Sequence, residues 1–343
     1  MPKDNENIRL PLIGPVEPSE PQGFTPDQMI TCEECLRANP PTRINCLYCS
    51  VPLPATESSV RLRKPILRRP EKHQLGYNTI YLPSADLSAE AVREAAALLK
   101  LKEPDLERIL SENIPLPLAR TASREEAELI VDRLQRLGFR IVTLVDEGFV
   151  KRVKSIAFEE SRFVINPGNP KNEVAVAWSN VLLLVPARLI EKRVEVKEVK
   201  SRRAENELLD TSEFFSDQPV IDIYLSTHSE TWRISASGFD FSCLGSEKAL
   251  VTNENLTRLQ RRLVAQATNA RFDDSYNRLR PLLDLVWGSE QETKSSGWRR
   301  ERPGRLSLGM ATINSNESQF TRYSRLLYYI RNLTGLQKLQ DSS

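Results

Sequence analysis

The spacing of apolar and polar residues predicts a small α/β module at residues 75–149. Short runs in which β-branched or aromatic residues alternate with polar ones are typical of half-buried strands. Runs in which apolar residues recur three and four positions apart are typical of amphipathic helices. The expected order is strand, helix, helix, strand, helix, strand. The first strand is expected at 77–82, and the first helix is capped by Asp86 or Ser88 and reaches Leu101. The other elements are expected after Pro104 and at 115–120, 123–137 and 140–145.

The third helix of this module carries signals at both ends. Ser123-Arg124-Glu125-Glu126 is a capping box, in which the serine hydroxyl accepts an N–H of the first turn and Glu126 reaches back to the serine N–H. Gly138 is expected to end the helix in the left-handed conformation. Both boundaries of this helix are therefore predicted from chemistry rather than from periodicity alone.

Residues 150–270 change to short strands separated by turn residues, and they end in one amphipathic helix that starts at Asn253 or Asn255. Val181–Val185 is continuously apolar, as in a strand covered on both faces, and residues 200–218 are expected to form a polar loop. This pattern predicts a mostly antiparallel, barrel-like β domain closed by a helix. The expected strands are at 155–158, 162–165, 174–178, 181–185, 193–199, 220–225 and 231–235.

Residues 271–343 form an expected C-terminal extension that contains a docking helix. Phe320, Tyr323, Leu327 and Ile330 recur at helical spacing, which favours a stripe that packs on the preceding domain. Arginines interleave with these aromatic residues, so stacking on single-stranded bases is the alternative. Residues 299–305 are expected to form a basic loop.

Proline and charge divide the N-terminal part of the chain. Twelve of the 22 prolines precede residue 71, which favours extended connectors on both sides of a small folded segment. We expect a disordered tail at 1–24, a finger at 25–52 and a basic linker at 53–74. The linker could contact nucleic acid or an anionic surface, or it could be a solvated connector. The candidate contacts are Arg61, Arg63, Lys64, Arg68 and Arg69.

Two Cys-x-x-Cys pairs, separated by ten residues, give the strongest chemical signal in the chain. Two such turns present four thiolates to one ion, with Zn–S distances of ~2.3 Å. A segment of roughly 25 residues cannot bury a sufficient core and needs a metal or disulfides. We expect a structural zinc ion bound by Cys32, Cys35, Cys46 and Cys49. Two disulfides, a redox pair and an iron site with the same ligands are the alternatives.

The cysteine spacing, with Asn39 between the pairs, resembles the Ran-binding-protein type of zinc finger, and a generic zinc ribbon is an equal description. The resemblance implies a finger fold and a ubiquitin- or RNA-binding role. This chain has Leu36-Arg37 where ubiquitin-binding members carry Thr-Phe, and Ile30 where a Trp is usual. Residues 36–45 lack the aromatic residue on which RNA-binding members stack bases, which leaves Tyr48 and Arg43 as contacts.

Two further segments resemble known families. The order of elements at 75–147, with the closest match at Ser123 to Val142, resembles the C-terminal domain of the bacterial ribosomal stalk protein. Residues 150–270, with the segment Val174–Val181, resemble a pleckstrin-homology-like barrel. That resemblance implies peptide or partner binding. Phosphoinositide binding is disfavoured because the first turn is Glu159-Glu160-Ser161, which would repel a phosphate.

Composition narrows the class of function. The formal net charge of +2 over 343 residues argues against a dedicated duplex-DNA binder. No apolar signal segment is present, and no apolar run approaches the ~20 residues of a spanning helix, so we expect a cytoplasmic protein. His73 and His228 are the only histidines, and the 13 glycines form no phosphate loop.

The sequence thus predicts a multidomain α+β protein that is not an enzyme. It is expected to be an adaptor that binds a protein partner and carries a structural zinc finger. The alternative is an RNA- or translation-associated protein that binds through the finger and the basic residues 61–72.

Overall fold

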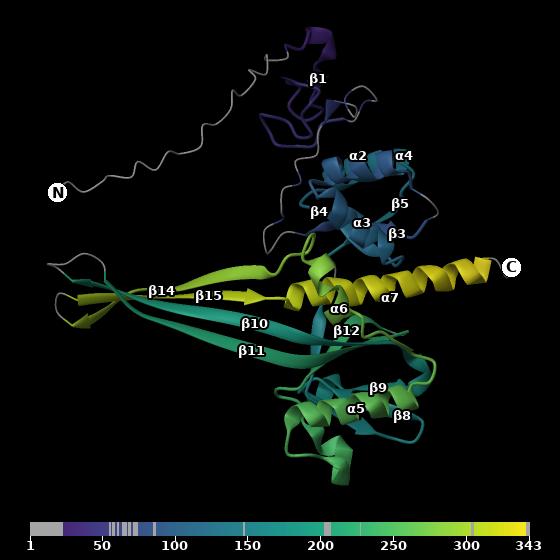
Figure 1. Ribbon diagram of the computed structural model, residues 1–343, viewed down its shortest axis with the longest axis vertical. Helices are drawn as coiled ribbons and strands as arrows, with labels where there is room; N and C mark the ends of the chain where they lie inside the picture. The colour runs from purple at the N-terminus through teal and green to yellow at the C-terminus, as the bar shows by residue number, and fades with distance from the viewer. Residues whose placement is uncertain are drawn as a thin grey trace, which may run out of the picture. The chain divides into compact units, whose positions relative to one another are not determined.

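The computed structural model describes residues 23–54, 56, 59, 62–63, 67, 70, 75–84, 87–146, 148–201, 207–226, 228–302 and 305–340. The chain divides into two compact units, Met1–Lys64 and Pro65–Ser343, and combines helices with several sheets (Figure 1). Almost all of the expected tail 1–24 and most of the expected linker 53–74 lie outside the described residues.

The described part of the first unit contains little regular structure. A 3₁₀ turn, η1 (Pro26–Gln28), precedes two short antiparallel strands, β1 (Ile30–Thr31) and β2 (Ala38–Asn39). Its apolar core consists of Ile30, Cys32, Cys46 and Leu53, with Cys35 packed against it. Because so few side chains are buried, packing alone gives this unit little stability.

The second unit begins with the α/β segment, whose elements follow the predicted order. A central strand β3 has an antiparallel neighbour on each side, in the order β4-β3-β5, and the helices pack against this sheet. The elements are β3 (Tyr77–Leu82), α2 (Ala89–Leu99), α3 (Glu103–Ser111), β4 (Leu116–Thr121), α4 (Arg124–Arg136) and β5 (Arg140–Val145).

The boundaries of α4 follow the predicted signals, with one difference. The Ser123 hydroxyl accepts the N–H of Glu126 at 3.2 Å, and Gly138 takes a left-handed φ of 89°. The Glu126 carboxylate, however, accepts the backbone N–H of Leu67 at 2.6 Å, so this side chain fixes a residue far away in sequence. One half of the capping box is therefore formed, and the buried glutamate has a tertiary role.

A strand-rich part follows. A small antiparallel sheet has the order β7-β8-β9, and a larger sheet has the order β14-β15-β10-β11-β12-β6, with β13 beside β10. The strands are β6 (Val150–Val153), β7 (Ser155–Phe158), β8 (Arg162–Asn166), β9 (Val174–Ala177), β10 (Val181–Ser201), β11 (Glu207–Leu225), β12 (His228–Ser235), β13 (Arg271–Phe272), β14 (Glu290–Arg302) and β15 (Arg305–Ser315).

Two predicted loops are wrong. The segment expected as a polar loop at 200–218 lies largely in β10 and β11, and these strands pair over almost their whole length. The expected basic loop at 299–305 lies in the hairpin of β14 and β15, which adds to β10. These four strands continue past the helices as a long ribbon, which we call the arm (Figure 1). The strand expected at 193–199 lies within β10, but the described side chains at 211–217 of β11 are mostly exposed, so no apolar alternation marks that stretch as a strand.

The larger sheet separates two cores, because neighbouring side chains on β10 and β11 point to opposite faces. Leu183 and Tyr224 lie in a core shared with the α/β segment and the C-terminal helices. Leu184 and Ile223 lie in a core shared with α5 and the sheet β7-β8-β9. The helices of this part are η2 (Pro170–Asn172), η3 (Trp178–Asn180), η4 (Phe241–Glu247), α5 (Thr252–Gln266), α6 (Tyr276–Leu283) and α7 (Glu317–Gln340).

The C-terminal helix α7 is fixed to the sheet by aromatic and ionic contacts. Phe320 and Tyr323 are buried, and Leu327 and Ile330 pack on the same core, so the aromatic stripe faces the protein. On the neighbouring strands, the fully buried Asp222 binds Arg233 with two hydrogen bonds of 2.7 and 2.9 Å. Three side chains of the helix bind this pair. Glu317 and Thr321 accept hydrogen bonds from Arg233, and Ser324 donates one to Asp222.

Candidate metal centre

Each Cys-x-x-Cys pair of the first unit forms the same tight turn. The N–H of Leu36 donates to the Cys32 carbonyl at 2.9 Å, and the N–H of Ser50 donates to the Cys46 carbonyl at 3.1 Å. Leu36 and Ser50 both adopt a left-handed φ, 56° and 62°. Sulfur-ligand turns often place glycine at such a position, and its absence from the sequence concealed this shared geometry.

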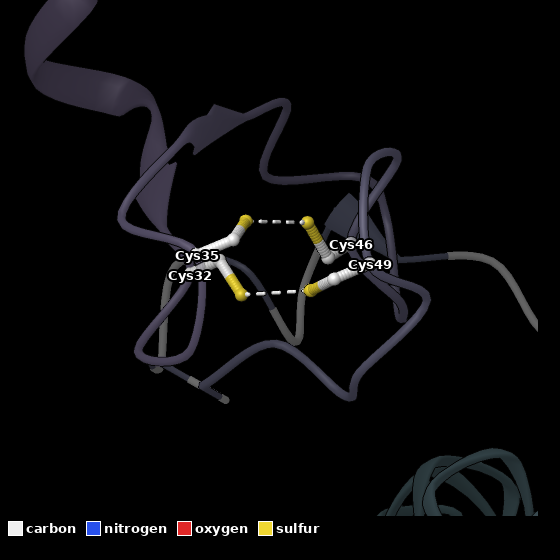
Figure 2. A group of neighbouring side chains, drawn as sticks. All are labelled: Cys32, Cys35, Cys46 and Cys49. Carbon is white, nitrogen blue, oxygen red and sulfur yellow. Dashed lines mark hydrogen bonds between the residues drawn. The ribbon is translucent and has the colours of Figure 1, made fainter.

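The four thiol groups converge on one point, as Figure 2 shows. The Sγ atoms of Cys32 and Cys49 are 3.5 Å apart, as are those of Cys35 and Cys46, and all four lie within 4.8 Å of one another. A tetrahedron with metal–sulfur bonds of ~2.3 Å has sulfur–sulfur edges of about 3.8 Å. The four cysteines therefore fit a single metal ion, and all four are free thiols.

Electrostatics within the cluster also favour a cation. Burial raises the pKa of Cys46. Hydrogen bonds from backbone N–H groups and neighbouring side chains have the larger, opposite effect, and the pKa falls to about 6. For Cys49 a backbone N–H lowers the pKa, but burial and the three other cysteines raise it to about 12. Negative charges on four sulfur atoms this close would repel one another. A bound cation would offset this repulsion and allow all four thiols to ionise.

Asn39 positions the cysteine ligands through hydrogen bonds of its side-chain amide. Its side chain is fully buried, and the amide donates to the Arg37 carbonyl at 2.8 Å and to Cys46 Sγ at 3.5 Å. Its Oδ1 accepts the N–H of Leu47 at 2.8 Å. One side chain thus links β2 to both Cys-x-x-Cys turns, which explains the asparagine between the two pairs.

Several large side chains of this unit face solvent. Leu36, Leu47 and Tyr48 are 76%, 51% and 56% exposed. The Arg37 guanidinium lies 4.7 Å from the centre of the Tyr48 ring, as in a cation–π contact. Arg43 is also exposed. The metal-binding turns therefore present apolar and aromatic groups at the surface.

The basic residues predicted as anion contacts are only partly described. Arg61, Lys64, Arg68 and Arg69 lie outside the described residues. Arg63 is buried, and its Nη2 donates to the carbonyl oxygens of Leu53 and Pro54 at 3.4 and 2.7 Å. In this structure its guanidinium is engaged by the chain itself rather than presented to solvent.

The two histidines and the fifth cysteine, Cys243, are the other side chains that could act as nucleophiles, bases or metal ligands. His73 lies outside the described residues, and the Nδ1 of His228 is 3.6 Å from a carboxylate oxygen of Glu230 on the same strand. Burial raises the pKa of the Cys243 thiol to about 11, so this thiol is protonated at neutral pH. A protonated thiol is a poor nucleophile and a poor metal ligand.

A cavity of about 970 Å³ in the second unit was not foreseen from the sequence. Its ionisable groups include a chain of ion pairs, in which Asp146 binds Arg120 at 2.6 Å and Arg322 at 3.2 Å. Arg322 also binds Glu290 at 2.8 Å. These charges neutralise one another. The ion pairs also connect β4, the end of β5, α7 and β14.

Within the part of the chain that is described, no helix is both long and apolar enough to cross a membrane. No family model, no curated protein and no solved structure matches the chain.

Proposed function

We propose that the chain is a non-enzymatic, intracellular interaction protein whose N-terminal finger is held together by one structural zinc ion. The observation that carries the proposal is the convergence of Cys32, Cys35, Cys46 and Cys49 on one point. Thiolate ligands suit zinc, and a reducing compartment keeps them available. Four protein ligands would complete a tetrahedral zinc ion and leave no position for a substrate, which favours a structural role.

The interaction role rests on what the metal-binding turns expose. The side chains of Leu36, Leu47 and Tyr48 are more than half exposed, although the unit buries very few apolar residues. Exposed apolar groups on a rigid metal-held turn favour contact with a protein partner. The proposal does not include phosphoinositide binding, since Glu159 and Glu160 occupy the turn that would face a phosphate.

The architecture of the second unit supports the same role. The sheet β7-β8-β9, the strands β10 to β12 and the helix α5 enclose one core, which supports a pleckstrin-homology-like barrel. The sheet β4-β3-β5 with three helices supports a fold like the stalk-protein C-terminal domain. Both folds are part of the proposal, and both belong to protein-binding modules in the families that they resemble.

RNA binding is the second candidate, and the pair of Arg37 and Tyr48 favours it. A solvent-exposed ring with a guanidinium over it could stack on an unpaired base. Arg61, Lys64, Arg68 and Arg69 would then contact the phosphates. This candidate predicts steep salt dependence, whereas the apolar contacts of a protein interface depend less on salt.

A binding experiment with matched variants separates the two candidates. The full-length zinc-loaded chain, Leu36→Asp, Tyr48→Ala and the control Leu250→Asp would be compared, since Leu250 is fully exposed and lies in the second unit. Proteins captured by the parent and the control, and lost with Leu36→Asp, support the adaptor. Single-stranded RNA binding that is lost with Tyr48→Ala and with rising salt supports the alternative. Unchanged capture by Leu36→Asp contradicts a role for the finger in protein binding.

A further inference from the structure

The cavity of about 970 Å³ in the second unit is large enough to hold an organic ligand. It is lined by the end of β5 and the residues that follow it, by β14 and β15, and by α7 from Glu317 to Tyr329. Small-molecule sites in proteins have volumes of about 300–1,000 Å³. The size of the cavity therefore allows a ligand, and its side chains decide which kind.

Arg325 is the cationic side chain of this cavity that lacks an acidic partner. The three other cationic side chains in the lining pair with carboxylates: Arg120, Lys294 and Arg322. Among the described residues, the side chain of Arg325 makes neither an ion pair nor a hydrogen bond. A guanidinium presents five N–H donors in a planar fork that fits a carboxylate or a similar anion. An unpaired guanidinium in a cavity is therefore suited to bind such a group.

The backbone beside this guanidinium leaves room for it. Gly148 lies in the connection between β5 and β6 and has a left-handed φ of 93°. A Cβ atom at this position would overlap the Arg325 guanidinium. Glycine at position 148 thus serves both the conformation of the turn and the space that Arg325 occupies.

Hydrogen bonds and ring stacking hold the cavity walls in place. Trp287 is buried, and its indole N–H donates to Asn78 Oδ1 at 2.7 Å. The Asn78 amide in turn donates to the Asp146 carboxylate at 2.7 Å. The Tyr328 ring stacks on the Tyr224 ring, with centroids 4.8 Å apart. Because these side chains are already fixed, a ligand would have little ordering to impose on them.

Arg325 has aromatic neighbours on its own helix. Tyr328 and Tyr329 follow it by three and four positions, which places them on the same side of α7. All three residues line the cavity, as do the buried side chains of Leu326 and Trp287. The apolar part of a ligand whose anionic group is bound at Arg325 would therefore have rings to pack against.

Acidic side chains limit how much negative charge a ligand can carry. Five of them line the cavity, one more than the cationic side chains: Asp146, Glu191, Glu290, Glu292 and Glu317. A single negative charge at Arg325 is offset by the guanidinium. Further negative charges, as in a nucleoside triphosphate, would be repelled by these carboxylates. The lining thus favours a monoanion over a polyanion.

We propose that this cavity binds a small organic monoanion with an apolar, aromatic body. The Arg325 guanidinium holds its carboxylate or sulfonate group through charge-assisted hydrogen bonds, and Tyr328 and Tyr329 contact its body. All the residues of the site belong to the second unit. The site is therefore independent of the zinc finger and goes beyond the interaction role proposed above.

A matched pair of fluorescent probes tests the role of Arg325. Anilinonaphthalene sulfonate and N-phenylnaphthylamine share one aromatic body, and only the first carries an anionic group. The full-length, metal-loaded chain should bind one sulfonate probe in a saturable titration. Arg325→Gln should weaken this binding about 10- to 100-fold, as expected for a lost charge-assisted contact, and leave the neutral probe unaffected. Arg325→Lys should recover part of the affinity, because it keeps the charge without the fork.

The control is Arg261→Gln, because Arg261 is an exposed residue of α5 and should not influence either probe. Thermal unfolding confirms that each variant is folded. A parent chain without saturable binding of the sulfonate probe, or equal affinities of Arg325→Gln and Arg261→Gln for it, overturns the proposal.

Competition tests the limit on charge separately. Biphenyl monocarboxylate should displace the sulfonate probe at a lower concentration than biphenyl dicarboxylate, because the second carboxylate would meet the acidic side chains of the lining. Equal displacement by the two compounds, or stronger displacement by the dicarboxylate, contradicts a site for monoanions.

Discussion

The buried pair of Asp222 and Arg233 shows how single residues hold the second unit together. Arg233 is 1% exposed, and burial alone would lower its pKa. The nearby charges of Asp222 and Glu317 raise the pKa instead, so the guanidinium stays charged. Ser324 on α7 donates to the same Asp222 carboxylate at 2.8 Å. The pair therefore fixes the position of the C-terminal helix on the sheet.

Replacing one member of this pair should be costly. Arg233→Met leaves the Asp222 carboxylate in the core without its cation, and such a change destabilises a protein by about 3–5 kcal/mol. Urea unfolding of the second unit measures this loss. The double variant Asp222→Leu/Arg233→Met should recover most of the stability, since it leaves no unpaired charge. A loss below about 1 kcal/mol for Arg233→Met would mean that the charges contribute little.

Asn39 is the residue through which the protein positions its sulfur ligands. Asn39→Ala removes the amide that donates to Cys46 Sγ and the oxygen that accepts the N–H of Leu47. Loss of such a supporting group typically weakens metal affinity by about 10- to 100-fold. Competition with a chromophoric chelator measures this affinity, and the exposed Asn45 supplies a control as Asn45→Ala. Equal affinities for both variants would contradict a supporting role for Asn39.

Residues whose chemistry is local could be predicted from the sequence, whereas residues whose partners are distant along the chain could not. The spacing of Cys32, Cys35, Cys46 and Cys49 carries its own geometry, and the four thiols do converge. Nothing near Glu126 in the sequence indicates that its carboxylate binds the N–H of Leu67. Such contacts depend on the tertiary fold, which local patterns do not encode.

Among the helices and strands, those that bury one face could be predicted from the sequence more readily than those that are exposed. The α/β segment buries one face of each helix, so its apolar period is clear. The described side chains at 211–217 are mostly exposed, and residues 200–218 were expected to form a polar loop, whereas the strand expected at 193–199 lies within β10. The strand conformation of residues 207–218 comes from pairing with β10, which no local pattern reports.

The helix α4 offers a direct test of a predicted element boundary. Ser123→Ala removes the hydroxyl that accepts the N–H of Glu126, and loss of such a cap costs about 1 kcal/mol. Ser123→Asp should retain the stability, because aspartate caps helices equally well. Thermal or urea unfolding of the full-length chain checks both variants. Equal destabilisation by alanine and aspartate would show that the cap is not the cause.

At the scale of the whole molecule, the chain divides into a metal-dependent unit and a unit with its own cores. Among its described residues, the first unit has a small apolar cluster of Ile30 and Leu53 besides its cysteines. The second unit buries two extended cores on either side of its larger sheet. Removal of a metal ligand should therefore affect the two units very differently.

Cys46→Ser should release the ion and unfold the first unit only. Hydrogen exchange would then increase across residues 25–54, while residues 87–146 and 150–201 keep the protection of the parent chain. Cys243→Ser is the control, since this residue lies in the second unit. Loss of protection throughout the chain would contradict two independent units.

Elemental analysis combined with thiol titration tests whether the four cysteine thiolates bind one structural zinc ion. Such a zinc site predicts one zinc per chain in the purified protein, with four thiols that become reactive only after a strong chelator removes the metal. Iron in place of zinc, substantially less than one metal ion per chain, or disulfides between these cysteines in protein taken directly from cells would contradict it.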